Sequence, residues 1–290
     1  MAMERRQGKE MLSKFLSDKL AVFGSVMLLI FIFVALFADH LVIHDPNEQN
    51  VALQLLSPCE EYPLGTDDMG RCIYSRLISG STNTLGNAFA VLLGMLVIGV
   101  PMGVLAGHYG GVVDTVIMRL VDIVCTFPSS MVALAVVSLL GPGTFNIMLV
   151  LVSLWWAPLA RMVRGEVLRI KEKEFVMAAR AAGSTDLQIM VHHILPNILA
   201  PVLVYATLRV GSIIMHIAGF SFIGLGTQPP QADWGVMLSS SRDYIMLKPL
   251  MMVWPGLAIM LVVFSLNLIG EGLSQAIRPY HEHLSVKEKI

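Results

Sequence analysis

Charged residues are scarce in this chain. They make up 14% of its 290 residues, whereas 55% of the residues are hydrophobic, and the mean hydropathy is +0.70. Soluble globular domains carry about 25% charged residues. The composition therefore excludes an ordinary water-soluble domain and predicts a membrane protein.

Cysteine is scarce too, and the three cysteines cannot all pair with one another. Cys59 and Cys72 lie in one polar segment, while Cys125 lies within an apolar stretch. A disulfide between Cys59 and Cys72 is an open hypothesis, on condition that their segment faces an oxidising compartment.

Two kinds of binding site are missing from the sequence. The net charge is −1, and no cluster of lysine and arginine is interleaved with aromatic residues, which excludes a base-stacking groove for nucleic acid. The only Gly-Lys pair, Gly8-Lys9, is followed by Glu10 and has no glycine loop before it. A phosphate-binding loop needs Ser or Thr after the lysine and glycines upstream. We therefore expect no ATP hydrolysis by this chain.

The sequence does contain a series of long uncharged stretches. A helix needs about 20 apolar residues to cross the hydrocarbon layer, and Gly141-Pro142-Gly143 divides one stretch in two, because glycine and proline together end helices. The sequence thus predicts an all-α polytopic protein with six transmembrane helices, at 20–38, 84–106, 115–140, 144–162, 198–223 and 249–270. The first is expected to stay uncleaved, because it is longer than the apolar part of a signal peptide and no clear A-x-A site follows.

Lysine and arginine outside the spans are unevenly distributed. Fourteen lie in the two tails and around the segment between the fourth and fifth spans, and only Arg71, Arg76, Arg242 and Lys248 lie in the other loops. Cytoplasmic segments collect these residues, so we expect both termini to be cytoplasmic. This topology gives a tail and first span at 1–38, extracytoplasmic loops at 39–83 and 224–249, a membrane core at 84–272 with a cytoplasmic loop at 163–197, and a cytoplasmic tail at 273–290.

The polar segment between the fourth and fifth spans has the pattern of two short helices. Gly183 is expected to stop the first, Ser184, Thr185 and Asp186 can cap the second, and Pro196 marks the start of the next span. The residues at helical spacing are Phe175, Ala178, Ala179 and Ala182 in the first helix and Leu187, Met190, Val191 and Ile194 in the second. Two interpretations fit: a plug whose alanines let a partner's backbone approach closely, or a surface hairpin that packs on its own protein.

The same segment resembles the EAA loop of the membrane subunits of ABC importers. The resemblance rests on E-x-x-x-A-A-x-x-x-G, nine further residues and then x-I-L-P. The matching residues are Glu174, Ala178, Ala179, Gly183 and Ile194-Leu195-Pro196, with Arg180 inside the motif and His193 at a position that is usually apolar. The resemblance implies that this loop seats in a groove of a separate ATP-binding subunit and carries its motion to the membrane helices.

Two more stretches extend the resemblance over nearly the whole chain. LGTDDMGRCIYSRLISG at 64–80 and FSFIGLGTQPPQADWGVML at 220–238 are similar to the outer loops of peptide and nickel importer permeases, with Cys72 where the family commonly has aspartate. The resemblance implies the type I ABC importer permease fold, the bacterial inner membrane and the role of a C-type permease. Its implied partners are a homologous B-type permease, two ATP-binding subunits that use ATP and Mg, and an extracytoplasmic solute-binding protein. No cofactor is expected on this chain.

Polar residues inside the spans are candidates for a translocation path, because ionisable groups in lipid are costly. Tyr205, Arg209, Ser212 and His216 recur at steps of three or four in the fifth span and share one helical face. They either form packing and partner contacts, or line the passage and meet a solute that bears carboxylates or a metal. His216 is only a weak metal candidate, because a nickel site usually needs several N, O or S donors.

Asp122 in the third span is a further path candidate. Arg119 lies three residues before it and is expected to pair with it, and Pro128 frees a backbone carbonyl that a passage could use. Cys125, Thr126 and Ser129 continue the polar line from Asp122.

The expected cargo follows from the resemblance alone. MHIAGFSFIGLG and VDIVCTFPSS are more similar to nickel and metal-chelate importers than to peptide importers, so nickel or a metal chelate is expected, with a di- or oligopeptide as the alternative. An ion-coupled secondary carrier is a remote rival, because such carriers often show inverted repeats and several midplane carboxylates. A purely structural scaffold would leave the outer loops unexplained.

Overall fold

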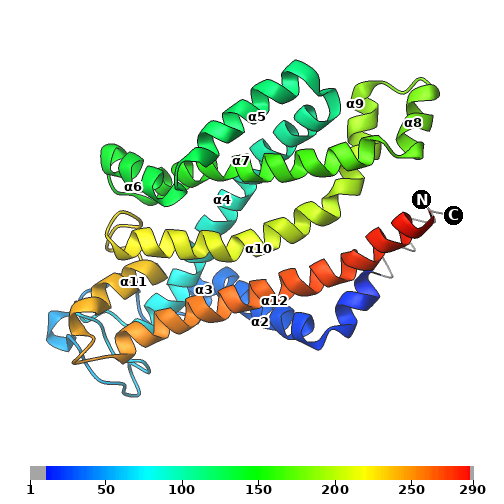
Figure 1. Cartoon of the computed structure of the whole chain (residues 1–290). Coiled ribbons are helices and arrows are strands. Elements are labelled where there is room, and N and C mark those ends of the chain that lie inside the picture. Colours follow the sequence, from blue (N-terminus) through cyan, green and yellow to red (C-terminus); the bar gives the residue numbers. More distant parts are fainter. Residues whose placement is uncertain (1–10, 288–290) are drawn as a thin grey trace.

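The computed structural model describes residues 11–287, with side chains up to residue 277. The Gly8-Lys9 pair lies outside the described residues. Every regular element within this range is a helix, apart from an isolated β-bridge between Thr66 and Cys72 (Figure 1). The all-α prediction is confirmed for this range.

Five helices of the described chain are long and apolar enough to cross a membrane. They are α2 (Lys19–Leu36), α4 (Ile73–Tyr109), α7 (Thr144–Lys171), the helix Asp186–Phe222 that ends with α10 (Leu195–Phe222), and α12 (Leu250–Lys287). Five of the six predicted spans fall on these helices. α2 starts where the sequence provides a cap, since the Asp18 carboxylate accepts hydrogen bonds from the backbone N–H groups of Leu20 and Ala21.

The third predicted span is not one straight helix, which corrects the expectation for 115–140. It consists of α5 (Gly111–Thr126) and α6 (Ser129–Leu140), and the two are bent by 82°. Pro128 causes the break, because its ring excludes the helical conformation at the preceding residue. Phe127 is accordingly extended, with φ −96° and ψ 143°. The two helices count as the sixth span only if the bent pair is taken as one.

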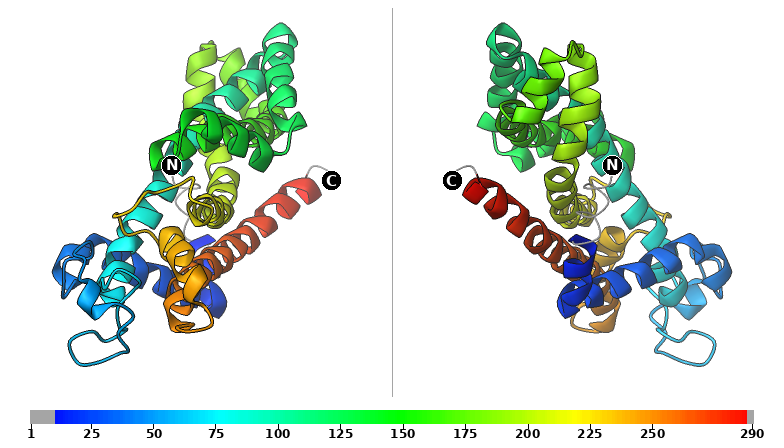
Figure 2. Two further views of the ribbon diagram at one scale, coloured as in Figure 1. Left: turned by 90° about the vertical axis from the view of Figure 1, so that its left-hand side faces the viewer. Right: turned by 90° about the vertical axis from the view of Figure 1, so that its right-hand side faces the viewer.

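The long helices form stacked layers. α5 packs on α7, α7 on α4 and α10, α10 on α12, and α12 on α2. Figure 2 shows α12 and α5 on opposite sides of the molecule, with α10 between them. In Figure 1, the start of α2, the end of α12 and the segment around α8 (Glu174–Ala181) lie at one end of the molecule, and α11 (Trp234–Ser241) lies at the other. The assignment of the first end to the cytoplasm rests on the distribution of lysine and arginine.

A row of glycines brings α4 and α7 into close contact. Gly99, Gly103 and Gly107 follow one another at steps of four on α4. A Cβ atom at Gly103 would lie 2.6 Å from the Ala160 carbonyl oxygen, and one at Gly107 would lie 2.6 Å from Val167 Cβ. Small residues at this spacing let two membrane helices approach until their backbones touch. The two helices therefore behave as one packed unit.

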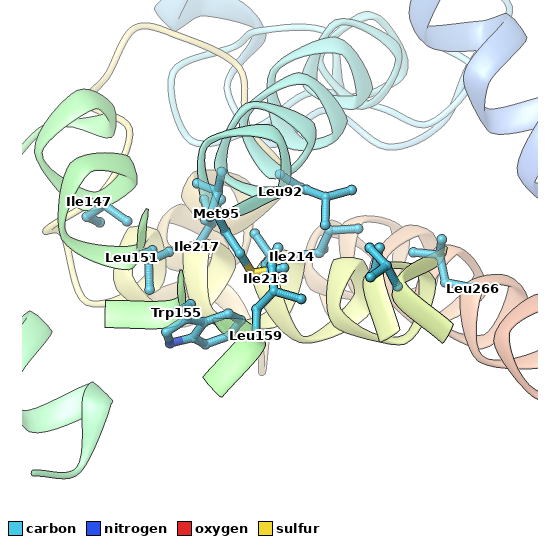
Figure 3. Close-up of a cluster of buried hydrophobic side chains, with 14 of the residues drawn as sticks. Leu92, Met95, Ile147, Leu151, Trp155, Leu159, Ile213, Ile214, Ile217 and Leu266 are labelled. Carbon is cyan, nitrogen blue, oxygen red and sulfur yellow. The ribbon is translucent and has the colours of Figure 1, made fainter. Parts of the chain in front are cut away.

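The main apolar core lies where α4, α7, α10 and α12 meet. Figure 3 shows this cluster, to which α4 contributes Leu92 and Met95, α7 Leu151, α10 Ile214 and α12 Leu266. Because all four helices contribute to a single core, a shift of one is transmitted to the others by packing.

Candidate functional sites

The polar segment after α7 folds as a helix, a turn and a second helix, as the sequence predicts. α8 ends before Gly183, which has φ +87°, a conformation that glycine adopts at little steric cost. The N–H groups of Gly183 and Ser184 donate to the carbonyls of Arg180 and Ala179, which closes the turn. Thr185 then caps α9 (Asp186–Gln188) through a reciprocal pair of hydrogen bonds with Gln188.

The second helix of this hairpin is continuous with the fifth span rather than separate from it. α9 passes through a π-helical stretch, η2 (Ile189–Ile194), directly into α10. Pro196 lies in the first turn of α10 and has no N–H to offer the preceding turn, and a π-helical stretch is one way in which a helix absorbs such a defect. The second helix of the hairpin and α10 are therefore one continuous helical segment.

The hairpin is also fixed to the end of α4. Nε2 of His108, in the last turn of α4, lies 2.9 Å from Oδ1 of Asp186. Nearby, the Lys171 ammonium donates to the Gly107 carbonyl at 3.0 Å, which joins the end of α7 to the same turn of α4. The hairpin thus has a polar contact to α4, through Asp186, in addition to its covalent connections to α7 and α10.

One face of the hairpin is buried and the other has no cover within the described chain. Val176, Ile189 and Ile194 belong to the main core. Most of the predicted stripe points away from it: Phe175, Ala178 and Ala182 of α8 and Leu187 and Val191 of the second helix are exposed. The hairpin thus packs on its own protein through one face, and the exposed residues on the other face leave room for a partner. The coupling candidates Glu174, Arg180, Gly183 and Pro196 are exposed as well, and Ala179 is half-buried.

Three of the four polar residues on α10 line one cavity of about 320 Å³. Cys125 and Phe127 of the bent pair and Trp155 of α7 form the opposite walls, and the full lining is Val124, Cys125, Phe127, Ser129, Leu154, Trp155, Pro158, Tyr205, Arg209 and His216. The Arg209 Cζ atom lies 5.0 Å from the centre of the Tyr205 ring and 5.8 Å from the centre of the Trp155 ring. Ser212 is not in the lining, and its carbonyl lies 2.8 Å from His216 Nδ1.

Asp122 lies outside this cavity, and its predicted pairing with Arg119 is wrong. Its carboxylate instead accepts a 2.7 Å hydrogen bond from Arg161 of α7. Asp114 pairs in the same way with Arg164, so two ion pairs join α5 to α7. Arg119, Asp122 and these partners line a second, open cavity of about 360 Å³. Residues three apart on a helix can meet, but the arginine that reaches the carboxylate here comes from the facing helix.

The two outer loops interlock around the start of α4. The buried Arg76 donates to the Pro46 carbonyl of the first loop and to the Pro230 carbonyl of the second, at 2.8 and 3.2 Å. Asp67 pairs with Arg71 at 2.7 Å. Further hydrogen bonds join Trp234 Nε1 to the Leu77 carbonyl, Asn83 to the Ala232 carbonyl and Thr84 to Asp233. The two stretches that resemble importer loops therefore form one structural unit.

The cysteines of the first loop are not joined, so the disulfide hypothesis is wrong for this structure. Cys59 is exposed and free, and Cys72 is buried and free. Cys72 is the N-cap residue of α4 and makes no side-chain hydrogen bond to the helix. An aspartate, which the family commonly has at this position, would accept such a bond. Cys72 does not make this contact.

Sequence reasoning missed several residues that the structure places at these sites. His108, Trp155 and Asp233 were not singled out, because their roles depend on segments far away in the chain. The G-x-x-x-G-x-x-x-G spacing of Gly99, Gly103 and Gly107 was the one signal that could have been found. No group of three or more His, Cys, Asp or Glu among the described side chains is arranged as a metal site.

Comparison with known proteins agrees with this architecture. The family described as binding-protein-dependent transport system inner membrane component matches residues 99–279, and the N-terminal TM domain of oligopeptide transport permease C matches residues 6–58. The MetNI methionine ABC transporter in an inward-facing conformation has the same fold, with a TM-score of 0.56 at 21% identity over 69% of this chain and 95% of that chain.

The relatives that this chain matches over most of its length are named for different transported solutes. The dipeptide transport system permease protein of Alkalihalophilus pseudofirmus is 40% identical over 93% of this chain and 89% of its own. The nickel transport system permease protein of Escherichia coli is 38% identical over 92% and 96%, and the glutathione transport system permease protein of Pectobacterium atrosepticum is 36% identical over 95% and 92%. The chain therefore belongs to the family of bacterial inner-membrane permeases of binding-protein-dependent ABC transporters, as a C-type permease of its peptide and nickel branch.

Proposed function

We propose that this chain forms half of the passage of an ATP-driven importer. The movement that drives transport is transmitted from the ATP-binding subunits to this chain at the hairpin 174–194. The observation that carries the proposal is the mechanical position of this hairpin. Its outer face exposes apolar side chains, among them Phe175, Leu187 and Val191, with no cover within the described chain. The hairpin is also bonded to α4 and continuous with α10. A subunit that grips the outer face can therefore move two membrane helices at once.

The energy source and the remaining partners are part of the same proposal. Two ATP-binding subunits hydrolyse ATP with Mg²⁺ and dock on the hairpin, a homologous B-type permease supplies the other half of the passage, and an extracytoplasmic solute-binding protein docks on the interlocked outer loops. Family membership supports these partners, because the family is described by its dependence on a binding protein. On this chain we assign the passage to the cavity beside Tyr205, Arg209 and His216.

The coupling role is tested at Gly183. A Cβ atom at this position would meet no atom of the described chain within 4 Å, and φ is +87°. Asp and Asn both tolerate this conformation better than other residues with side chains, so the pair Gly183→Asp and Gly183→Asn differs mainly in charge. We expect Gly183→Asp to assemble in the membrane but to lose uptake, because the charge faces the partner, and Gly183→Asn to retain most of it. Full uptake by an assembled Gly183→Asp complex would refute the docking role.

We propose nickel or a metal chelate, and a di- or oligopeptide, as the two candidate cargoes. The nickel and dipeptide relatives support them about equally, at 38% and 40% identity. Uptake of radiolabelled nickel and of a radiolabelled dipeptide, each in cells with and without this chain, separates the two. A nickel uptake that does not depend on the chain would remove nickel from the proposal.

A further inference from the structure

The cavity beside α10 has an uncompensated positive charge. Arg209 is the only Asp, Glu, Lys or Arg among its ten lining residues. Its guanidinium makes no ion pair with any described carboxylate. Two arginines of the second cavity have a different setting, because Arg161 and Arg164 are each paired with an aspartate.

Two aromatic rings hold Arg209 in this place. The guanidinium lies within 6 Å of the ring centres of both Tyr205 and Trp155, a distance at which the ring faces attract a cation. Stacking on a ring occupies the face of the guanidinium and leaves its N–H groups, which lie in the plane, available. Those donors form a fork that matches the two oxygens of a carboxylate.

His216 completes the wall with a defined ring orientation. Its ring packs edge-on against Trp155, with 4.7 Å between ring centres. Nδ1 lies 2.8 Å from the Ser212 carbonyl, and a carbonyl can only accept, so Nδ1 carries the proton. The contact fixes the orientation of the ring and directs Nε2 away from the backbone of its own helix. The cavity offers a cationic donor at Arg209 and, at His216, an imidazole whose orientation is fixed.

From this arrangement we infer that the cavity is a relay site, meaning a site that binds the cargo transiently on its way through the membrane. Arg209 binds a carboxylate group of the cargo there, while Tyr205 and Trp155 hold the guanidinium in place. The inference rests on the proposed function in one respect, namely that this cavity belongs to the passage. It narrows the cargo by chemistry: a peptide with its terminal carboxylate, or a metal held by a carboxylate-bearing chelator, is favoured, whereas an uncomplexed divalent cation is repelled by the lone guanidinium.

Cys125 provides a test that needs no transport activity. It is a free, exposed thiol in the wall of the same cavity. In the assembled transporter with Cys59→Ser, which removes the exposed thiol of the outer loop, we expect an anionic methanethiosulfonate (sulfonatoethyl) to modify Cys125 about tenfold faster than a cationic one (trimethylammonioethyl), relative to their rates with a free thiol. Arg209→Gln should abolish this preference, and Arg209→Lys should keep most of it.

Arg119→Gln is the matched control, because Arg119 lies on the same helix as Cys125 but lines the other cavity. This variant should keep the anion preference. A wild-type Cys125 that reacts equally with both reagents, or an Arg209→Gln variant with unchanged selectivity, would overturn the relay site.

Uptake then separates the relay site from the proposed function. Proteoliposomes with the full transporter and its binding protein are given ATP and one of four labelled probes: diglycine, diglycinamide, nickel citrate or Ni²⁺ in a weakly coordinating buffer. We expect uptake of diglycine or nickel citrate but not of the other two, and a loss of roughly tenfold or more in Arg209→Gln. Uptake of uncomplexed Ni²⁺ that Arg209→Gln leaves unchanged would overturn the relay site. No ATP-dependent uptake of any probe, with the Cys125 preference intact, would count against the proposed function alone.

Discussion

Nε2 of His108 lies 2.9 Å from Oδ1 of Asp186, although 78 residues separate the two in the chain. The contact joins the last turn of α4 to the first turn of α9. The His108 side chain is 2% exposed, whereas that of Asp186 is 53% exposed. The buried His108 on the membrane helix thus holds Asp186 on the hairpin 174–194, which gives the hairpin a fixed position relative to α4.

Removal of this contact should loosen the hairpin without unfolding the protein. His108→Ala deletes one hydrogen bond to a carboxylate that is free to solvate, so the loss is about 1 kcal/mol. We expect amide hydrogen exchange in residues 174–194 to accelerate about fivefold. His192→Ala is the matched control, because His192 is exposed and contacts only the carbonyl of Gln188 in its own helix. Equal exchange in both variants would show that the His108 contact does not hold the hairpin.

The glycine row on α4 makes a prediction about stability. Gly103→Ala places a Cβ atom 2.6 Å from the Ala160 carbonyl oxygen, whereas a Cβ at Gly86 on the same helix meets nothing within 4 Å. We expect Gly103→Ala to lower the free energy of unfolding by about 1–3 kcal/mol through overpacking. Gly86→Ala should leave it unchanged or raise it by up to about 1 kcal/mol. Thermal unfolding of the purified complex in detergent measures both, and a Gly103→Ala variant as stable as Gly86→Ala would contradict close packing.

The buried Asp233 predicts a pH dependence. Burial raises the pKa of its carboxyl above the ordinary value of 3.8, against the opposing effect of hydrogen bonds from Thr84 and from the N–H groups of Gly235 and Val236. The folded protein then holds this proton more tightly than the unfolded chain. The contribution of this group to stability is therefore greatest below pH 3.8 and is lost as the pH rises through the raised pKa.

Asp233→Asn isolates this effect, since other carboxyls titrate equally in both proteins. The difference in Tm, wild type minus variant, should fall as the pH rises above 3.8 and should level off once the pH exceeds the raised pKa of Asp233. A difference that rises with pH would mean that the carboxyl is stabilised in its charged form. Asp39→Asn, at an exposed aspartate in α3 (Ala38–Leu41), serves as the control.

Cys72 offers a gain of stability. As the N-cap of α4 it makes no side-chain hydrogen bond to the helix. The Ile73 N–H already donates to the Gly65 carbonyl. Cys72→Asp provides an acceptor for the next N–H groups of the first turn and should raise the free energy of unfolding by about 1 kcal/mol. Cys72→Ser supplies the same acceptor without charge and should give part of the gain, whereas Cys72→Ala should give none. If alanine performs as well as aspartate, the position does not act as a cap.

Much of the fold could be predicted because its signals are local. The uncharged stretches located the long helices, since the length of a span is set by the thickness of the hydrocarbon layer. Gly183 and Thr185 lie where the sequence places the turn and cap of the hairpin, because positive φ and N-caps depend on neighbouring residues alone. The polar face of α10 was found in the same way, and three of its four members share a cavity.

The errors concern the third span and the partners of charged groups. The sequence predicts only a free carbonyl at Pro128, but the main effect of this proline is to hold Phe127 extended and turn the chain by 82°. The spacing predicts that Asp122 pairs with Arg119, yet Arg161 of α7 takes that place. The bend could have been predicted, because a proline inside a helical stretch ends or kinks the helix. The partner of Asp122 could not, because spacing shows which residues are near one another along one helix and not which helix packs beside it.

The sequence alone determined that this chain is a helical membrane protein, and it located the spans and the hairpin 174–194. Through its motifs it also determined which family the chain resembles. These properties follow from hydropathy, periodicity and turn chemistry, which act over a few residues at a time. Only the tertiary structure decided that His108 holds the hairpin, that Arg209 lies unpaired between Tyr205 and Trp155, and that the outer loops interlock through Arg76. These contacts depend on how whole helices pack, and packing is settled by the fit of all their side chains together.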